Sequence, residues 1–437
     1  MNGDIFLRSV WPGRQVSATR SLRGTYTLAK RHHLGEQALQ GAVVGATNEY
    51  PKRLPPPSPL MRRITQSLAA LPAYQGIPAL ADAPPAFTEV GIRYSHYSED
   101  SLDRDKMIFG SENRYDIDIT QLWIEAPLGA NWSVALDVQN DYQSGASPWF
   151  VGAQGNGDPG VIMSGASIQD NRVEVGVATR YFWADGNAGF AISHSDEDDY
   201  DATALGFDIA WNSADGSRTW STSFSSSQDN VRPTRGAIPV FIEEGELDTQ
   251  SAYFGVTQIL SRTTIARIGL NYTYSEGYLS DPYKLRDNRP DKHERLALSL
   301  GYRRFLIDFD ASLQADYRYY ADSWGTDSHA LELGWAQNLE NSLLTPYFRY
   351  YSQRQADFFG DIADFSATHY ADDYRLSSYG ALTLGARWSV SLNEQWTLEL
   401  EAERYETSKD WGLYNGNEAP ALVNFWRGTI ALIWRFE

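Results

Sequence analysis

The chain has 437 residues, no cysteine and a formal net charge of −19, so disulfides, thiolate metal sites, iron–sulfur clusters and covalently attached c-type haem are excluded. The acidic balance also argues against a nucleic-acid partner, because phosphate binding needs clustered Lys and Arg. No run approaches the roughly 18 uninterrupted apolar residues that a transmembrane helix requires.

The start of the chain differs from the rest. Residues 1–60 show neither a hydrophobic period nor turn signals, and we interpret them as a disordered extension or as sequence upstream of the true translation start. Residues 61–83 open with Met61-Arg62-Arg63, pass through a moderately apolar stretch and end in Ala-Asp-Ala, the pattern of a secretory signal peptide. This places the mature chain at residues 84–437.

From Phe87 onward the dominant hydrophobic period is two, which predicts strands rather than helices. In "EQWTLELEAERYE", for example, Trp396 and Leu398 share one face while Thr397 and Glu399 share the other. Most of the segments are longer than the usual five or six residues of a globular strand. The sixteen expected strands are 87–97, 113–126, 131–143, 167–180, 185–195, 200–212, 217–228, 248–260, 263–276, 292–304, 307–320, 328–338, 343–354, 376–392, 395–407 and 423–436.

The connections between these strands alternate between short turns and longer loops along the whole chain. This alternation is typical of an outer-membrane barrel, whose turns are periplasmic and whose long loops are extracellular. The predicted fold class is therefore all-β: a transmembrane, up-and-down, antiparallel β-barrel of about 16 strands. We expect it in the outer membrane of a Gram-negative cell, with both termini in the periplasm.

Aromatic residues and the last strand support this prediction. In "GTIALIWRFE" the residues Ile430, Leu432, Trp434 and Phe436 alternate as a lipid face, and this strand is expected to pair with the first, since an open edge is not stable in hydrocarbon. It resembles the C-terminal signal read by barrel-assembly machinery, with Phe436 one residue early. The tryptophans expected in a periplasmic girdle are Trp123, Trp132, Trp183, Trp211, Trp220, Trp335, Trp388, Trp396 and Trp434.

Parity places many charged residues in the lumen, and sixteen strands are enough to enclose an aqueous channel. A charge ladder is expected where acidic and basic strands adjoin: Arg387, Glu399, Glu401, Glu403, Arg427 and Arg435. It either tunes permeation or forms a salt-bridge lattice that stiffens the wall. The other residues assigned inward are Asp116, Asp118, Asp137, Asp208, Asp308, Asp310, Asp316, Arg267, Arg295, Arg303, Arg318 and Arg349.

Enzymatic and metal-binding alternatives have weaker support. The five histidines beyond residue 83 fall at loop-side strand ends or in loops, where nearby aspartates offer a metal site. An outer-membrane hydrolase needs a Ser and a His within hydrogen-bond reach, and no nucleophile motif appears. We assign no catalytic, cofactor or metal residues. The histidines are His96, His194, His293, His329 and His369.

Several stretches resemble a bacterial family of outer-membrane barrels known only as a domain of unknown function: "SGASPW", "GYLSDPYKL", "RPDKHERLAL", "YRYYADSWGTDSHALELGW" and "LTPYFRYYSQRQADFF". The resemblance runs from about Pro85 to Phe436. Proteins of that family are often encoded beside a small lipoprotein, a thioredoxin-like protein and a flavin transferase, and the resemblance therefore implies a link to extracytoplasmic redox maturation or export. The family's recurrent residues correspond here to Gly277, Tyr278, Asp281, Pro282, Tyr283, Lys284, Arg289, Pro290, Asp291, Trp324 and His329.

We expect the recurrent residues to lie in two adjacent outer loops, which either fold inward as a constriction or recognise a ligand or partner. The candidate site is Asp281, Tyr283, Lys284, Arg289, Asp291, Trp324 and His329. The expected function is a conduit for small polar solutes or ions, or an export component. The alternatives are a non-conducting scaffold and a hydrolase. Expected partners are membrane lipid, lipopolysaccharide, barrel-assembly machinery and a periplasmic lipoprotein or thioredoxin-like protein.

Overall fold

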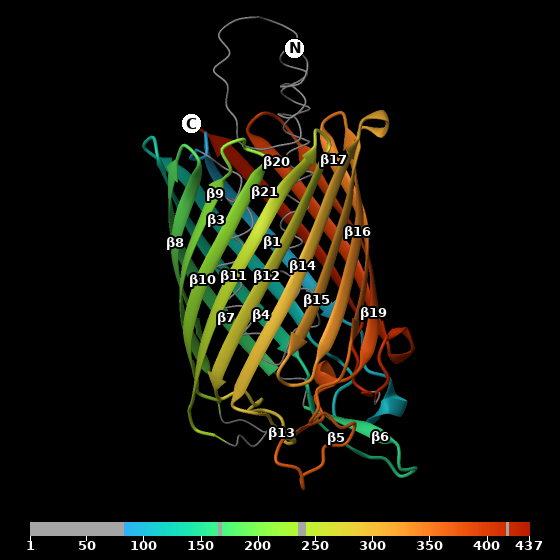
Figure 1. Cartoon of the computed structure of the whole chain (residues 1–437). Coiled ribbons are helices and arrows are strands. Elements are labelled where there is room, and N and C mark those ends of the chain that lie inside the picture. The colour runs from blue at the N-terminus through green and yellow to red at the C-terminus, as the bar shows by residue number, and fades with distance from the viewer. Residues whose placement is uncertain (1–82, 165–167, 235–241, 417–418) are drawn as a thin grey trace, which may run out of the picture.

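The structure, a computed structural model, describes residues 83–164, 168–234, 242–416 and 419–437. Sixteen antiparallel strands close into one barrel, and the loops gather at the end away from the C-terminus (Figure 1). The extension expected at 1–60 and the signal peptide expected at 61–83 lie outside the described residues except for Ala83. All sixteen expected strands are confirmed. They are β1 (Thr88–Glu99), β3 (Asp116–Leu128), β4 (Trp132–Gly145), β7 (Ile168–Trp183), β8 (Gly186–Glu197), β9 (Tyr200–Asn212), β10 (Arg218–Val231), β11 (Gly245–Ser261), β12 (Thr264–Gly277), β14 (Lys292–Leu306), β15 (Ala311–Asp322), β16 (Asp327–Leu339), β17 (Ser342–Gln353), β19 (Tyr379–Ser391), β20 (Trp396–Ser408) and β21 (Phe425–Phe436).

The last strand closes the barrel against the first. β21 pairs with β1 along its whole length, from Thr88 opposite Phe436 to Glu99 opposite Phe425. The pairing leaves neither strand with an open edge, which is what a strand surrounded by hydrocarbon requires. The alternating sequence at the C-terminus is thus the closing seam of the barrel.

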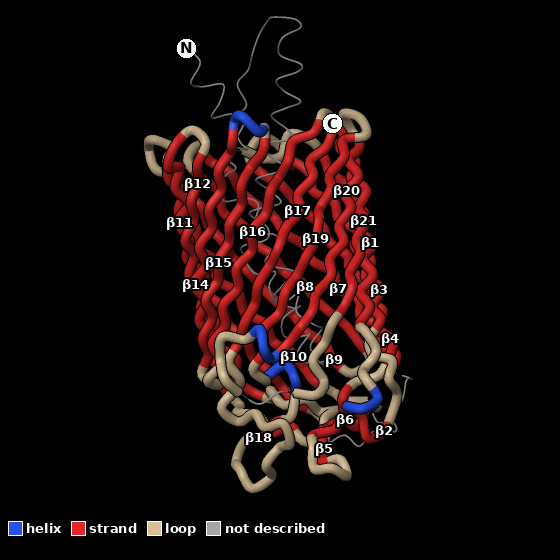
Figure 2. The backbone as a smooth tube through the Cα atoms, turned by 90° about the vertical axis from the view of Figure 1, so that its right-hand side faces the viewer, coloured by secondary structure: helices blue, strands red, loops and turns tan. Residues whose placement is uncertain are grey.

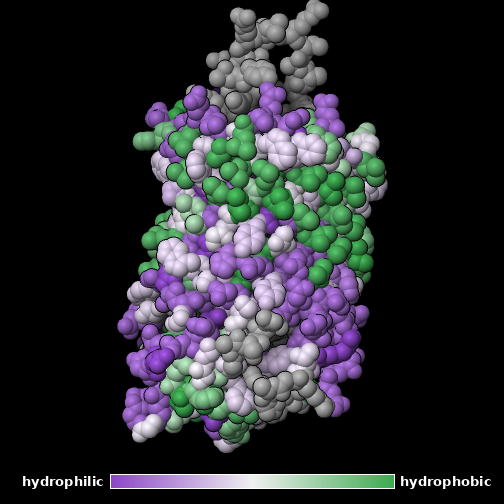
Figure 3. Space-filling model, turned by 180° about the vertical axis from the view of Figure 1, so that it is seen from behind, coloured by the Kyte–Doolittle hydropathy of each residue, from purple (hydrophilic) through white to green (hydrophobic). Residues whose placement is uncertain are grey.

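Side chains alternate between the two faces of the wall as the period-two pattern predicts. In β21 the exposed residues are Trp426, Gly428, Ile430 and Trp434, whereas Ala431 and Ile433 face inward and are buried. The face of the barrel seen in Figure 3 has an apolar band toward the turn end, and the surface is hydrophilic beyond it, toward the loops. The band gives the barrel a membrane-spanning zone shorter than its strands.

Two parity assignments are wrong in β3. Leu122 and Ile124 are exposed, so Asp116 and Asp118 on the same face point outward, not into the lumen. The carboxylate of Asp118 accepts a hydrogen bond from the Tyr94 hydroxyl at 2.5 Å on the outer surface. A shift of one residue inverts every side chain of a strand.

The same inversion affects one member of the expected tryptophan girdle. Trp123 faces inward, where its indole Nε1 donates to Glu89 at 3.0 Å. The other eight tryptophans of the girdle lie on the outward parity of their strands. Trp396 and Trp434 stack with ring centroids 5.7 Å apart, and Trp132 lies 4.9 Å from Tyr181.

One turn is also misplaced in the prediction. β14 continues to Leu306 and is followed by the 3-10 helix η4 (Ile307–Phe309) and by Asp310 with φ of 46°. Asp308 and Asp310 therefore belong to the turn rather than to the inward face of a strand. Ile307 and Phe309 are 62% and 63% exposed at the tip of this turn, which places apolar side chains near the membrane surface.

The loop end contains its own small elements (Figure 2). A three-stranded sheet orders β2 (Met107–Phe109), β6 (Pro159–Met163) and β5 (Pro148–Ala153), and a two-stranded sheet pairs β13 (Asp287–Asn288) with β18 (Tyr370–Ala371). Three short 3-10 helices accompany them: η3 (Arg104–Lys106), η5 (Tyr374–Leu376) and η6 (Lys409–Trp411). These elements lie below the barrel wall and form a separate layer.

Candidate functional site

The long loops pack together as a layer that we call the lid: residues 100–115, 146–164, 278–291, 354–378 and 419–424. Their apolar side chains share one buried cluster with inward side chains from the loop ends of ten of the sixteen barrel strands. A layer anchored to the wall around most of the ring covers the mouth of the barrel at this end. Buried lid residues of the cluster are Leu102, Tyr115, Ala146, Val161, Met163, Leu279, Ala356, Phe359, Ala371, Tyr374, Leu376, Ala419, Ala421 and Val423.

Hydrogen bonds join loops that are far apart in sequence. The Lys284 ammonium donates to the carbonyl of Pro148 at 2.8 Å, and the backbone N–H of Val151 donates to the Asp372 carboxylate at 2.9 Å. The Arg114 guanidinium donates to the carbonyl of Ala421 at 3.0 Å. Each link satisfies a buried polar group with a partner from another loop, so the loops are ordered together.

The centre of the lid is a buried ion cluster. The Arg289 guanidinium lies 2.6 Å from the Asp287 carboxylate and 2.8 Å from that of Asp373, and all three side chains are 0% exposed. Arg375 also pairs with Asp373, and lies 3.4 Å from Asp281. Removing the partner of a buried charge is strongly destabilising. This cluster therefore fixes how loops 278–291 and 354–378 pack against each other.

The carboxyl groups of the lid have pKa values shifted in different directions by burial and by neighbouring cations. Burial raises the pKa of Asp372 from its ordinary value of 3.8 to about 7, although Lys284 and the Val151 N–H act against it. Burial also raises the pKa of Asp287, with Arg289 opposing. At Asp373 burial acts in the same sense, but Arg375, Lys284 and Arg289 together lower the pKa. Asp373 is therefore the charged centre of the cluster.

Five of the seven candidate site residues take part in buried contacts of the lid or its edge. Asp281, Lys284 and Arg289 take part in the contacts above. Tyr283 donates its hydroxyl hydrogen bond to Asp199 and accepts one from the Thr234 N–H at 3.0 Å. Trp324 is buried, stacks on His293 at 3.7 Å and donates its Nε1–H to the carbonyl of Lys292.

The other two candidate residues lie apart from the cluster. The Asp291 side chain is exposed, and its carbonyl accepts from the Gly277 N–H at 2.9 Å. His329 is on the outward face of β16, hydrogen-bonded to the hydroxyls of Tyr317 at 2.7 Å and Tyr414 at 2.8 Å. The sequence reading grouped His329 with the loops by position in the chain, but the side-chain parity of β16 places it outside.

Three lid residues were not singled out from the sequence, although they carry the cluster: Asp287, Asp373 and Arg375. The segment "ADDYRL" around the last two is polar within a long loop, a composition that gives no sign of burial. Asp373 pairs with Arg289 across 84 residues of chain. That contact depends on how two loops cross the mouth of the barrel.

The charge ladder of the lumen is a connected lattice over five neighbouring strands. Arg387 on β19 lies 3.2 Å from Glu401 and 3.5 Å from Glu332. Arg427 on β21 lies 3.1 Å from Glu401 and 3.2 Å from Glu403. Three arginines and three glutamates balance in charge once Arg349 is included, which pairs with Glu332.

Tyr347 on β17 occupies the middle of this lattice. Its hydroxyl oxygen lies 2.6 Å from the Glu403 carboxylate and 2.9 Å from that of Glu401, so its one proton has two acceptors, and the Arg387 guanidinium lies over its ring at 4.2 Å. Gly385 on β19 makes room for the ring, because a Cβ there would overlap it. The side chains thus lie flat along the wall instead of pointing to the barrel axis.

The remaining ladder residues pair nearer the turn end. Arg435 lies 2.8 Å from Glu89 and donates to the Thr397 hydroxyl at 3.2 Å. Glu399 lies 3.9 Å from Arg93. All six expected ladder residues face inward and have charged partners, as in a salt-bridge lattice. A role in tuning permeation stays a prediction.

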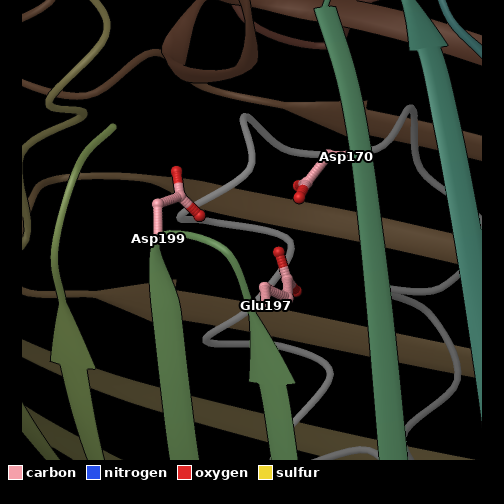
Figure 4. Close-up of side chains that lie close together, drawn as sticks. All are labelled: Asp170, Glu197 and Asp199. Carbon is pink, nitrogen blue, oxygen red and sulfur yellow. The ribbon is translucent and has the colours of Figure 1, made fainter. Parts of the chain in front are cut away.

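A cluster of carboxylates lies at the loop end of the barrel, at Asp170, Glu197 and Asp199 (Figure 4). One oxygen of each lies within 4.8 Å of the others. Arg172 lies 3.7 Å from Glu197, and Tyr283 donates to Asp199. With a guanidinium and a hydroxyl beside it, the cluster is an attachment point for the lid.

The described histidines do not converge. His96, His194 and His329 face outward on different strands, His369 is exposed in loop 354–378, and His293 faces inward and hydrogen-bonds to Asp322 at 2.9 Å. The side-chain partners of the four histidines on strands are Asp118, Thr203, Asp322, Tyr317 and Tyr414. None of these partners is a serine, and they do not form the Ser–His contact that a hydrolase needs.

A family model described as "Protein of unknown function (DUF3570)" matches residues 65–424. No curated protein was found to match the sequence. Among the described residues, no helix has the length and apolar character to cross a membrane.

Solved structures similar to this one include three outer-membrane barrels. They are CdiB from Acinetobacter baumannii (8% identity, TM-score 0.45, 80% of this chain and 60% of that one), a bacterial polysaccharide outer membrane secretin (10%, 0.44, 80% and 98%) and the CymD monoaromatic hydrocarbon channel (9%, 0.39, 80% and 89%). This chain therefore spans less than two thirds of CdiB. At TM-scores below 0.5 these likenesses do not distinguish a function.

Proposed function

Because this chain belongs to the DUF3570 family of proteins of unknown function, its role has to be argued from its own geometry, and we propose that it is a gated conduit for small polar solutes or ions. In this proposal the barrel resides in a Gram-negative outer membrane, with the turns and the C-terminus on the periplasmic side. The lid is the gate at the outer mouth.

The charged lining of the lumen carries the proposal. Barrels of eight strands fill their interior with side chains, whereas those of sixteen to eighteen can hold water. Here the inward face bears ion pairs along its length, from Glu89–Arg435 near the turns to Glu99 at the loop end of β1, which pairs with Arg114 of the lid. A purely structural interior has no need of so many charges, because well-packed apolar residues stabilise at least as well.

The flat orientation of the lining supports the same conclusion. Tyr347 lies against Gly385, and the Arg180–Asp208 pair lies against Gly189. Side chains held against the wall leave the axis of the barrel less obstructed. Their mutual ion pairs hold them there.

The lid explains why such a conduit need not leak. Its ion cluster and apolar core are buried, and two loops contribute the opposed charges. Displacing loop 278–291 from loop 354–378 breaks that cluster. In this proposal, a surface ligand that separates these two loops opens the lid.

Conductance in planar bilayers tests the proposal. The wild type is expected to give rare steps, and the double variant Arg289→Met with Arg375→Met to give frequent ones because its lid is released. The control is Asp291→Asn, which changes an exposed side chain in the same loop. Heat-modifiable migration on a gel verifies that each barrel is folded. A silent baseline from both the wild type and the lid variant refutes the conduit.

A second candidate is a non-conducting scaffold, and the packed lid favours it. In that case the loops present a fixed surface to a partner, and lid release reduces partner binding without producing conductance. The partners we propose for either role are lipopolysaccharide at the outer face and a lipoprotein or thioredoxin-like protein in the periplasm. Insertion of the barrel by barrel-assembly machinery belongs to both proposals. Capture of the periplasmic partners by the purified barrel is the corresponding assay.

A further inference from the structure

The charged side chains that face into the barrel include more carboxylates than arginines. In the sixteen barrel strands, as far as the structure describes their side chains, sixteen inward carboxylates stand against eleven inward arginines, a net of −5. The excess lies in one run of neighbouring strands, β3, β4, β7, β8, β9 and β10. This run, which we call the acidic wall, has eight of the carboxylates and two of the arginines, a net of −6.

The other ten strands do not offset the acidic wall. Their described residues include nine inward arginines and eight inward carboxylates, a net of +1. The lattice around Tyr347 is an example, since its three arginines balance its three glutamates. The sign of the whole lining is therefore set by the acidic wall.

Ion pairs within the acidic wall leave much of its negative charge in place. The Arg172 guanidinium is shared by three carboxylates with buried side chains. It lies 3.1 Å from Asp141 and 3.7 Å from Glu197, and it also pairs with Glu174. One guanidinium balances one carboxylate, so this group keeps a net of −2.

Two other carboxylates of the acidic wall contribute less charge. Asp208 is balanced by Arg180 at 2.7 Å. Burial raises the pKa of Asp229, at the loop end of β10, to about 7, so this group is partly protonated at neutral pH. With Asp229 counted as neutral, the acidic wall keeps a net of −5 and the whole lining a net of −4.

Three further carboxylates of the acidic wall are partly exposed, and they face the lumen: Glu125, Asp137 and Asp170. Glu125 lies near the turn end of β3, Asp137 in the middle part of β4 and Asp170 near the loop end of β7. Negative charge therefore follows the acidic wall from one end of the barrel to the other.

The lid has the same sign of charge as the acidic wall. Its loops 100–115, 146–164, 278–291, 354–378 and 419–424 contain thirteen Asp and Glu against eight Lys and Arg, a net of −5. A solute that enters from the loop end passes these residues before it reaches the lumen. Both parts of the path favour positive charge.

We propose that the conduit selects small cations over anions, and that the acidic wall sets this preference. The inference rests on the proposed function. Carboxylates that line a pore attract cations and repel anions. Low-dielectric walls around a water-filled space focus this field, which raises the local concentration of counter-ions.

The reversal potential across a KCl gradient measures the preference in planar bilayers. The lid-released variant, Arg289→Met with Arg375→Met, is expected to pass K⁺ at least about threefold more readily than Cl⁻ at about 0.1 M salt. The ratio is expected to fall toward one at about 1 M, where the Debye length is about 3 Å. The rare steps of the wild type are expected to show the same preference, which separates it from the two lid charges removed.

The lumen variant neutralises part of the acidic wall in the lid-released background. It combines Glu125→Gln, Asp137→Asn and Asp170→Asn, which reduces the net charge of the acidic wall from −6 to −3. The ratio of K⁺ to Cl⁻ is expected to fall by about half or more. Heat-modifiable migration verifies the fold, and the double variant Glu125→Gln with Asp137→Asn takes its place if the triple variant does not fold.

A matched control removes three carboxylates from the outside of the barrel in the same background. It combines Asp116→Asn, Asp196→Asn and Glu246→Gln, all of which are outward and exposed, and it is expected to keep the ratio. The inference is supported if the ratio falls in the lumen variant and stays in this control. Equal passage of the two ions, a preference for Cl⁻, or the same ratio in both variants overturns the inference and leaves the conduit standing. The absence of conductance steps from the wild type and the lid-released variant refutes the conduit and this inference together.

Discussion

Replacing Arg289 with methionine removes the guanidinium between two buried carboxylates of the lid. Asp373 keeps Arg375 as a partner, but Asp287 is left as a buried charge without Arg289. Breaking a buried ion pair on one side costs about 3–5 kcal/mol. Because the cluster joins loops 278–291 and 354–378, this loss is expected in the local stability of the lid rather than in the barrel.

Hydrogen exchange measures that local stability. Amides of the lid are expected to exchange roughly two to four orders of magnitude faster in Arg289→Met, since 1.36 kcal/mol corresponds to a factor of ten. Amides of β12 and β14 serve as the internal reference. Adding Asp287→Asn removes the stranded charge, so the double variant is expected to recover part of the protection.

Arg286→Met is the matched control. Its guanidinium lies in the same loop but donates to the carbonyl of Val151 and rests over the rings of Phe150 and Phe365. Its loss is expected to cost about 0.5–2 kcal/mol. Equal acceleration of exchange in Arg286→Met and Arg289→Met, or no recovery in the double variant, refutes the ion-pair reasoning.

The effect of Arg289→Met also has a predictable pH dependence. Burial raises the pKa of Asp287 and Arg289 opposes that rise, so the pKa is higher still without the arginine. An acid whose folded-state pKa is raised contributes stability at low pH that is lost as the pH rises through that pKa. The lid of Arg289→Met is therefore expected to be better protected at about pH 5 than at about pH 8.

Three further changes test other parts of the structure. Asp372, with a pKa raised to about 7, should weaken the lid as the pH rises from about 4 to about 7, and Asp372→Asn should abolish that slope in the exchange of the Val151 amide. Gly385→Ala should destabilise the barrel by about 1–3 kcal/mol through overlap with the Tyr347 ring, measured by the temperature at which folded gel migration is lost; Gly428→Ala, where a Cβ meets nothing within 4 Å, is the control, and equal values contradict the packing argument. Phe436→Ala removes the ring that lies 4.2 Å from Trp434 on the closing strand and should slow barrel assembly in vesicles, whereas Glu437→Ala should not.

Lumen and lid differ in how much the sequence revealed of them. Glu401 and Glu403 are two residues apart on one strand, so alternation alone placed both inward. Their partner Arg427 is on the next strand, and adjacency in a meander follows chain order. The lattice could therefore be predicted from the sequence. Asp116 and Asp118 were misplaced because alternation fixes which residues share a face but not which face turns inward.

What the sequence determined by itself is the barrel: a period-two pattern, alternating turn lengths and a closing strand leave few other ways to satisfy the backbone in a membrane. What only the tertiary structure decided is the lid. Arg289, Asp373 and Lys284 acquire their partners across loops, and a polar loop sequence reads the same whether it is solvated or buried. Strand pairing is local in chain order, while the packing of loops over a mouth depends on the ring that brings their ends together.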